Sequence, residues 1–150
     1  MFLRLAYLGF KIYLFVFRPV RTGVRVMMLQ NDDVLLVRQT YMAGWFMPGG
    51  GLKRGETLEQ AARREAREEV GAELHDLHLL GVYTNFKEWK TDHNVVFISR
   101  SVTFSGRPDR EVAEARLFPL DDLPEGLWDG HRQRLEEARA GIDSPRFGEW

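Results

Sequence analysis

The hydrophobic and polar positions of this chain alternate between apolar runs of strand length and turn signals. Two runs rich in Val, Leu and Met, residues 22–30 and 34–37, flank the turn sequence Asn31-Asp32-Asp33. This pattern predicts two buried strands joined by a tight turn. Later apolar runs predict three further strands, at residues 77–83, 95–104 and 113–118.

Residues 58–70 show a helical period instead of a strand period. Thr57 and Gln60 form a capping box at the start of this segment. Gly71 stands at the position of a C-terminal helix cap. The segment is therefore expected to be a helix with defined ends.

A second helix is expected near the end of the chain. Asp121 or Asp122, with Pro124, is expected to open it, and it should run to about Ala138. Residues 142–150 have no clear period and are expected to form a loose tail. Strands and helices together predict one mixed α/β domain.

The composition narrows the chemistry. With 44% hydrophobic and 29% charged residues in 150, the chain resembles one globular domain and not a disordered or collagenous protein. It contains no cysteine, which excludes disulfides, zinc–thiolate sites and a cysteine nucleophile. A metal would be held by carboxylates, carbonyls or histidines, ligands that favour hard ions such as Mg²⁺ and Mn²⁺.

Charge is unevenly distributed along the chain. The net charge is −1, but the first 31 residues hold five basic residues and no acidic one, so the remainder carries −6. A domain of that sign is a poor candidate for binding the backbone of a nucleic-acid polymer. A small phosphorylated ligand is compatible with it, because a bound metal ion supplies positive charge locally.

Residues 1–19 form an apolar N-terminal arm. Three cations, Arg4, Lys11 and Arg18, recur every seven residues, so on a helix they would form one basic stripe. They leave apolar runs of only six residues, which are too short to span a membrane. Two interpretations stay open: the arm packs on the domain or on a second subunit in a homodimer, or it makes a peripheral contact with an anionic membrane surface.

The predicted helix carries acidic residues on the face that should be buried. Glu65 and Glu69 fall inside the apolar arc of a helical wheel, and Glu68 falls on its edge. The apolar positions of that arc are Leu58, Ala61, Ala62, Ala66 and Val70. Burying unpaired carboxylates is costly, and a divalent cation removes the conflict because oxygens at i, i+3 and i+4 converge on one point. The alternative is a solvated charge run with pairs such as Arg64–Glu68.

A glycine-rich loop precedes this helix, in the sequence Trp45-Phe46-Met47-Pro48-Gly49-Gly50-Gly51. Consecutive glycines let backbone groups approach a ligand that side chains would otherwise block. A helix N-terminus directly after such a loop favours phosphate oxygens. The loop is either a simple tight turn or, combined with the acidic helix, part of a metal–phosphate site.

Loop and helix together resemble the Nudix box. The match consists of Gly50, Glu56, Arg64-Glu65-Ala66, Glu68-Glu69 and Gly71-Ala72, in register and without a gap. Ala66 and Ala72 are smaller than the aliphatic residues that the family often has, which removes no ligand. The resemblance implies an α/β/α sandwich with a mixed β-sheet. A Nudix hydrolase domain at residues 20–140 would lie between the arm (1–19) and a C-terminal tail (141–150).

Similarity to Nudix hydrolases also implies an activity. The expected reaction is Mg²⁺- or Mn²⁺-dependent cleavage of the pyrophosphate bond of a nucleoside diphosphate linked to another moiety. The small-molecule substrate would be a nucleoside triphosphate or a nucleotide-sugar such as ADP-ribose. The alternative is a Nudix-like nucleotide-binding or regulatory module without turnover, against which the intact motif argues. A cytoplasmic location is expected, at the inner membrane surface if the arm binds lipid.

The motif implies roles for particular residues. The expected metal ligands are the Gly49 carbonyl and the carboxylates of Glu65, Glu68, Glu69 and, from a later loop, Glu111. Glu114 is the second choice for that later carboxylate. Glu65 or Glu69 would take the proton from the attacking water. Glu56 would pair with Arg64 and hold the carboxylates in place.

Substrate contacts are less sharply defined by the sequence. The expected ones are Arg38, Trp45, Gly50 and Gly51. Arg38 ends a strand beside the loop and would touch phosphate, with an ordinary solvated arginine as the alternative. The aromatic side chains that offer flat surfaces for stacking on a base are Tyr41, Trp45, Phe46, Phe86 and Trp89. For Phe46 core packing is the favoured interpretation.

Overall fold

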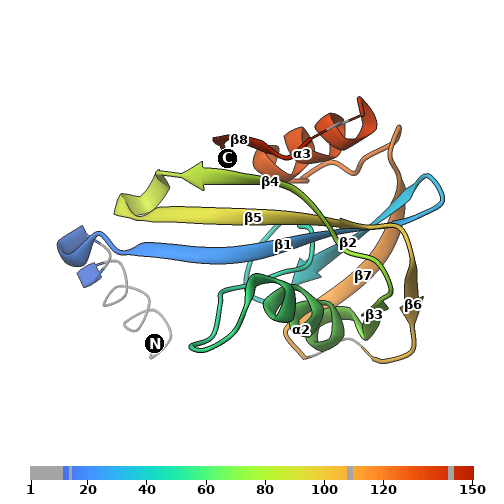
Figure 1. The fold of residues 1–150 in the computed structure, drawn as a ribbon, viewed down its shortest axis with the longest axis horizontal. Helices are drawn as coiled ribbons and strands as arrows, with labels where there is room; N and C mark the ends of the chain where they lie inside the picture. The colour runs from blue at the N-terminus through green and yellow to red at the C-terminus, as the bar shows by residue number, and fades with distance from the viewer. Residues whose placement is uncertain (1–11, 14, 108–109, 142–143) are drawn as a thin grey trace.

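The centre of the computed structural model is a six-stranded mixed β-sheet (Figure 1), and the structure describes residues 12–13, 15–107, 110–141 and 144–150. The strands are β1 (Val20–Gln30), β2 (Asp33–Gln39), β4 (His78–Asn85), β5 (Thr91–Ser99), β7 (Val112–Pro119) and β8 (Arg146–Glu149). Their order across the sheet is β7-β2-β1-β5-β4-β8. The neighbours β1–β5 and β4–β8 pair in parallel, and the others pair antiparallel.

Helices α2 (Leu58–Val70) and α3 (Asp129–Arg139) cover opposite faces of this sheet (Figure 1). Because side chains alternate along a strand, Val26 of β1 packs in the core on the α2 side and Met27 in the core on the α3 side. Strands β3 (Ala72–Leu74) and β6 (Val102–Phe104) form a small separate sheet, and the 3₁₀ turn η1 (Lys87–Trp89) joins β4 to β5. The predicted α/β/α sandwich with a mixed sheet is confirmed.

The acidic helix has the ends that its sequence predicts. Its N-cap Thr57 accepts a hydrogen bond from the Gln60 N–H at 3.2 Å, and the Gln60 side chain accepts one from the Thr57 N–H at 2.9 Å. Gly71 ends the helix in the left-handed conformation, with φ of 63°. Three alanines and Val70 are buried under the helix, whereas Leu58, expected in the buried arc, is 36% exposed.

The expected strand at residues 95–104 is wrong, because two strands in different sheets occupy it. Asp76 causes the break between β5 and β6. One of its carboxylate oxygens accepts hydrogen bonds from the Ser99 hydroxyl at 2.7 Å and from the N–H groups of Arg100 and Ser101 at 2.9 Å. These bonds turn the chain out of the large sheet, so that β6 pairs with β3.

The end of the chain also differs from the expectation. Helix α3 begins at Asp129, not near Asp122, because Gly126 has φ of 77° and its carbonyl accepts a hydrogen bond from the Trp45 N–H at 3.0 Å. The expected loose tail is wrong for residues 146–149, which form the edge strand β8 against β4. All four residues of β8 are exposed, so the strand has no apolar run for a sequence pattern to reveal.

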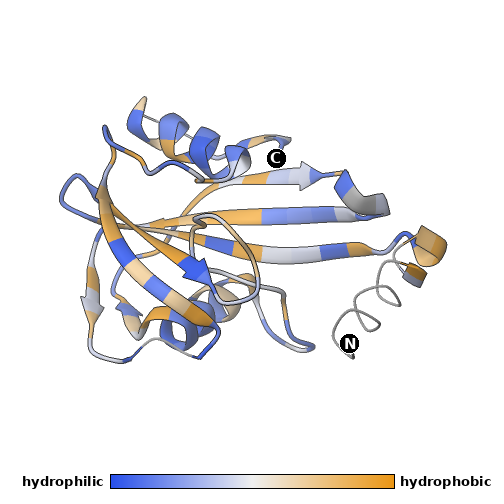
Figure 2. Ribbon diagram, turned by 180° about the vertical axis from the view of Figure 1, so that it is seen from behind, coloured by the Kyte–Doolittle hydropathy of each residue, from blue (hydrophilic) through white to orange (hydrophobic). Residues whose placement is uncertain are grey.

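Much of the N-terminal arm lies outside the described residues, which exclude 1–11 and 14. Residues 12, 13 and 15–17 are helical and exposed, and they form the hydrophobic turn that precedes β1 in Figure 2. Phe15 makes an edge-on contact with Trp89 of η1, with ring centroids 5.6 Å apart. Among the described helices, none is long and apolar enough to cross a membrane.

Candidate active site

Glu69 of α2 reaches the glycine loop. Its Oε2 atom accepts a hydrogen bond from the Gly49 N–H at 2.7 Å, and its Oε1 atom accepts one from the Gln39 amide at 3.3 Å. Burial outweighs these bonds and raises the pKa of Glu69 to about 7. Gly49 has φ of 147°, and a side chain there would collide with the Val24 carbonyl oxygen. The loop therefore requires glycine where it meets Glu69.

Glu65 meets the same loop one residue further on. A Cβ atom at Gly50 would lie 2.5 Å from the nearer Glu65 carboxylate oxygen. The absence of a side chain at Gly50 thus makes room for this carboxylate. Two of the three glutamates predicted as metal ligands on the helix, Glu65 and Glu69, lie against consecutive glycines.

Arg64 connects the carboxylates of the motif. Its guanidinium donates to both oxygens of Glu56, at 2.7 and 2.9 Å, and to Glu65 at 2.6 Å and Glu68 at 3.0 Å. It also donates to the Gly51 carbonyl at 3.1 Å. The hydrogen bonds from Arg64 lower the pKa of Glu56 to about 2. The Glu56–Arg64 pair implied by the motif is present, and it ties the loop to the helix.

Glu68 lies at the edge of this cluster. Its side chain is 48% exposed and lies 3.4 Å from the Lys53 ammonium group as well as near Arg64. The helical wheel placed it at the edge of the buried arc, which matches this position. Of Glu65, Glu68 and Glu69, Glu68 is the one that solvent reaches most easily.

The raised pKa of Glu69 makes the stability of the metal-free protein depend on pH. Its pKa is about 7 in the folded state against an ordinary 4.5, so it contributes stability that is complete below pH 4.5 and lost as the pH rises through 7. The full difference is on the order of 3 kcal/mol. In EDTA, the melting temperature of Glu69→Gln minus that of the wild type should therefore increase as the pH rises from about 5 to about 8. If the melting temperatures of the two proteins changed with pH in the same way, the raised pKa of a buried Glu69 would be contradicted.

The donors at this site fit a hard divalent cation. Among the described residues, no three His, Asp or Glu side chains already stand together as a metal site, since Glu65 and Glu68 face Arg64 and Glu69 faces the Gly49 N–H. The available groups are carboxylates and a peptide carbonyl, the ligands of Mg²⁺ and Mn²⁺. The raised pKa of Glu69 marks a poorly neutralised negative charge, which a cation would stabilise.

Two of the predicted substrate contacts, Arg38 and Trp45, lie next to each other. Trp45 is 9% exposed and packs edge-on against Phe118 in the core on the α3 side, which corrects its expected role in base stacking. Arg38 lies 5.6 Å from the Trp45 ring centroid and 3.5 Å from Glu114, its cross-strand partner on β7. Glu114 is therefore already paired.

Glu111 has closer electrostatic ties to the site than Glu114 has. Burial raises the pKa of Tyr41, and the negative charges of Glu111 and Glu69 raise it further. Both carboxylates therefore act on the same side chain. The Glu111 carbonyl accepts a hydrogen bond from the Thr40 N–H at 2.9 Å, which fixes the start of β7 beside Tyr41. Glu111 remains the better candidate for the later carboxylate.

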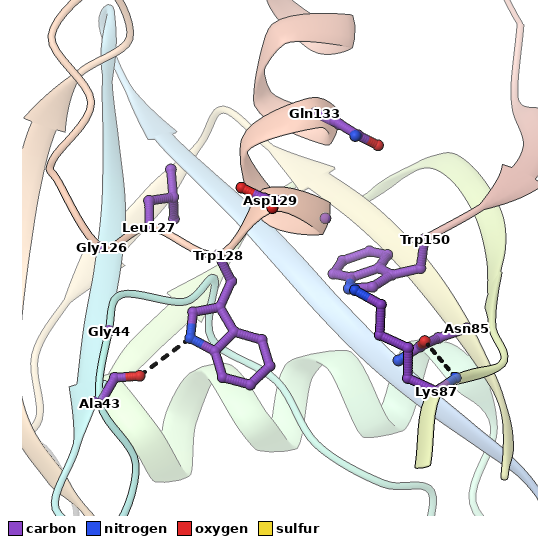
Figure 3. A pocket seen from close by; sticks show the side chains of 11 residues that line it. Ala43, Gly44, Asn85, Lys87, Gly126, Leu127, Trp128, Asp129, Gln133 and Trp150 are labelled. Carbon is purple, nitrogen blue, oxygen red and sulfur yellow. Dashed lines mark hydrogen bonds between the residues drawn. The ribbon is translucent and has the colours of Figure 1, made fainter. Parts of the chain in front are cut away.

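A cavity of about 620 Å³ opens on the α3 side of the sheet, and Figure 3 shows the indole rings of Trp128 and Trp150 on its walls. The Trp128 indole donates a hydrogen bond to the Ala43 carbonyl at 3.1 Å. An adjoining cavity of about 350 Å³ shares both tryptophans and reaches Phe46 and His131. Sequence reasoning missed both tryptophans, because β8 and the late start of α3 bring them together.

The sequence reasoning also missed Arg25. It stands between buried valines of β1, and its guanidinium donates a hydrogen bond to the Gly49 carbonyl at 2.7 Å. That carbonyl is one of the expected metal ligands, so Arg25 is part of the site. A cation in the middle of an apolar strand was the available signal.

A mixed sheet between two helices, with a glycine loop against an acidic helix, defines the Nudix fold and its motif. The NUDIX domain profile matches residues 19–138, and the chain belongs to the Nudix hydrolase family. A MutT NUDIX hydrolase from Burkholderia pseudomallei has a similar crystal structure, with a TM-score of 0.69 at 27% identity over 78% of this chain and 96% of that chain.

This chain matches different shares of the lengths of its curated relatives. An uncharacterized Nudix hydrolase of Bacillus subtilis, YvcI, is 33% identical over 69% of this chain and 71% of that protein. An ADP-ribose pyrophosphatase of Methanocaldococcus jannaschii is 30% identical over 67% and 62%. The NAD-capped RNA hydrolase NudC of Pseudomonas aeruginosa is 32% identical over 66% and 36%, so this chain spans about a third of that relative.

Proposed function

We propose that the protein is a Mg²⁺- or Mn²⁺-dependent hydrolase that cleaves the pyrophosphate bond of a nucleoside diphosphate linked to another moiety. The observation that carries this proposal is the placement of Glu65 and Glu69 against Gly50 and Gly49, beside the Arg64–Glu56 pair. A family member with these groups in place has the parts that hydrolysis of an anhydride requires.

The chemistry divides between a cation and the chain's own residues. A cation held by the helix carboxylates and the Gly49 carbonyl would neutralise the diphosphate oxygens and acidify a water. Glu65 or Glu69 would take a proton from the attacking water. The oxygen of this water would bond to phosphorus as the bridging P–O bond breaks, and the leaving phosphate would keep the electron pair of that bond. Without a cation the pKa of Glu69 is about 7, and a bound cation would favour its charged form, in which it can accept a proton. Arg64 holds Glu65 in orientation.

The substrate would place its nucleoside in the cavities on the α3 side. Trp128 and Trp150 offer ring faces, and Asn85 and Asn94 offer hydrogen-bonding groups. Relatives of this chain include the ADP-ribose pyrophosphatase described above and an oxidized purine nucleoside triphosphate hydrolase of Danio rerio. Both a nucleotide-sugar and a nucleoside triphosphate are thus proposed as substrate classes.

A panel of nucleoside triphosphates, their oxidised forms, ADP-ribose and dinucleotides tests this proposal directly. With Mg²⁺ or Mn²⁺, at least one member should yield a nucleoside monophosphate, detected by chromatography. Binding of a nucleotide without turnover, across the panel and with both metals, would support the regulatory-module alternative instead.

For the arm, we propose peripheral contact with an anionic membrane surface. Phe15 and Phe17 are 54% and 68% exposed. Arg18 follows Phe17 in the chain, and Lys87 lies in the same 3₁₀ turn as Trp89. Aromatic side chains next to cations are typical of segments that bind the membrane interface.

Vesicle flotation tests the arm. We expect the full chain to float with vesicles of phosphatidylcholine and phosphatidylglycerol, and F17S combined with R18E to reduce the bound fraction about tenfold. F147S, at an exposed position of β8 (81%), is the matched control and should leave flotation unchanged. A dimer in sedimentation that F17S dissociates, without flotation, would show that the arm binds a second copy.

A further inference from the structure

Arg25 has unfulfilled hydrogen-bonding capacity at the centre of the molecule. One terminal nitrogen of its guanidinium donates to the Gly49 carbonyl. Its buried Nε atom has no acceptor among the described residues. Desolvation lowers the pKa of Arg25, while the charges of Glu69 and Glu65 oppose that shift. A buried donor of this kind is costly unless a ligand completes it.

Gly49 lies between Arg25 and Glu69. Its N–H group donates to Glu69, and its carbonyl accepts from Arg25. Arg25 alternates along β1 with Val24 and Val26, which pack on the α2 side, so its side chain leaves the strand on the other face. A single residue of the loop therefore has an anion on one side and a cation on the other.

Two cavities meet at Arg25. The 350 Å³ cavity, bounded by Trp128 and Trp150, and a smaller one of about 170 Å³ beside Gly50 and Gly51 both have Arg25 in their walls. The other residues shared by both are Lys90, Asp92 and Asn94. An elongated ligand can therefore extend from the aromatic cavity, across Arg25, to the glycine loop.

The smaller cavity has the chemistry of a phosphate site. Arg21, Arg25 and Lys90 line it, together with one carboxylate, Asp92. Asp92 lies 2.9 Å from the Lys90 ammonium group, so their charges offset each other and the two arginines leave an excess of positive charge. Glycine backbone on the opposite wall leaves space for phosphate oxygens.

We infer that Arg25 binds the diphosphate of the substrate beside the glycine loop. The aromatic part of the substrate occupies the 350 Å³ cavity, and the diphosphate extends over Arg25 into the 170 Å³ cavity. There the phosphate oxygens accept hydrogen bonds from the Arg25 guanidinium. This inference rests on the proposed function for the identity of the ligand. It assigns diphosphate binding to a residue outside the Nudix box.

Calorimetric titration with inorganic pyrophosphate, in EDTA and without metal, tests this site. The wild type should bind, Arg25→Met should weaken binding at least about tenfold, and Arg25→Lys should give an intermediate affinity. Arg116→Met, the same change at an exposed position of β7, is the matched control and should bind as the wild type does. Should Arg25→Met not fold, the Arg25→Lys result alone decides, since an ammonium group cannot bind phosphate through two N–H groups of a planar fork as a guanidinium can.

The outcomes separate this inference from the proposed function. Wild-type protein that does not bind pyrophosphate, or an Arg25 variant that melts as the wild type does and binds equally well, overturns the inference. A variant that lowers the melting temperature but leaves pyrophosphate affinity unchanged shows a purely structural role and also overturns it. Binding that depends on Arg25, without hydrolysis of any nucleotide, supports the inference and contradicts the proposed function.

Discussion

Replacing Glu69 by glutamine is expected to lower kcat about 1,000-fold while the protein remains folded. Glutamine keeps the length of the side chain and an oxygen that can accept the Gly49 N–H bond. It removes the charge that would bind a cation and the basic group that would accept a proton. The measurement is steady-state hydrolysis of the best substrate from the panel, with the fold checked by circular dichroism.

Glu59→Gln is the matched control for this change. Glu59 lies on the same helix, but its side chain is 62% exposed and pairs with Arg63 at 2.9 Å. An exposed pair of this type contributes little, so turnover should stay within about twofold of the wild type. If Glu69→Gln and Glu59→Gln retained similar activity, Glu69 would have no part in the reaction.

Replacing Arg64 by leucine is expected to lower kcat about 100-fold or more, because the carboxylates lose the group that orients them. Arg64 donates to Glu56, Glu65 and Glu68 and to the Gly51 carbonyl, so its removal frees loop and helix from each other. A melting temperature below that of the wild type should accompany the loss. Arg64→Lys should recover only part of the activity, since an ammonium group cannot make the two-point contact with Glu56.

A double-mutant cycle with Glu56→Gln measures whether these residues act together. Because Arg64 holds Glu56 through two hydrogen bonds, at 2.7 and 2.9 Å, either single change should cost much of what the double change costs. Strictly additive losses in kcat would show that Glu56 and Arg64 act independently. The account of Arg64 as an orienting residue would then fail.

Most of the acidic helix and its loop could be predicted from the sequence, because the residues that define them are close together in the chain. The capping residues and Gly71 act on the helix turns next to them, and the glutamates of the motif lie one turn apart on the helix. The Glu56–Arg64 pair followed from the resemblance to the Nudix box, and its geometry is present. These features need no knowledge of distant packing.

Distant packing accounts for what the sequence did not reveal. Trp45 looked available for stacking, but its pairing with the segment at Leu127 and its contact with Phe118 bury it. The start of α3 depends on the same segment. Strand β8 has no buried residue, and only pairing with β4 defines it and places Trp150 in the cavity wall.

The role of Arg25 could have been suspected from the sequence but not located. A charged residue within the run TGVRVMML contradicts the apolar strand pattern, and such a contradiction often marks a functional position. Its contact with Gly49 joins residues 24 positions apart. Only the fold brings these residues together.

Thermal unfolding with and without Mg²⁺ at about pH 8 tests the central claim most directly, namely that the helix glutamates beside the glycine loop bind a divalent cation. Millimolar Mg²⁺ should raise the melting temperature of the wild type and of Glu59→Gln by a few degrees, through binding to the folded state. The same addition should leave Glu69→Gln unchanged. A wild type that does not respond to Mg²⁺ or Mn²⁺, or a Glu69→Gln protein that responds equally, would contradict it.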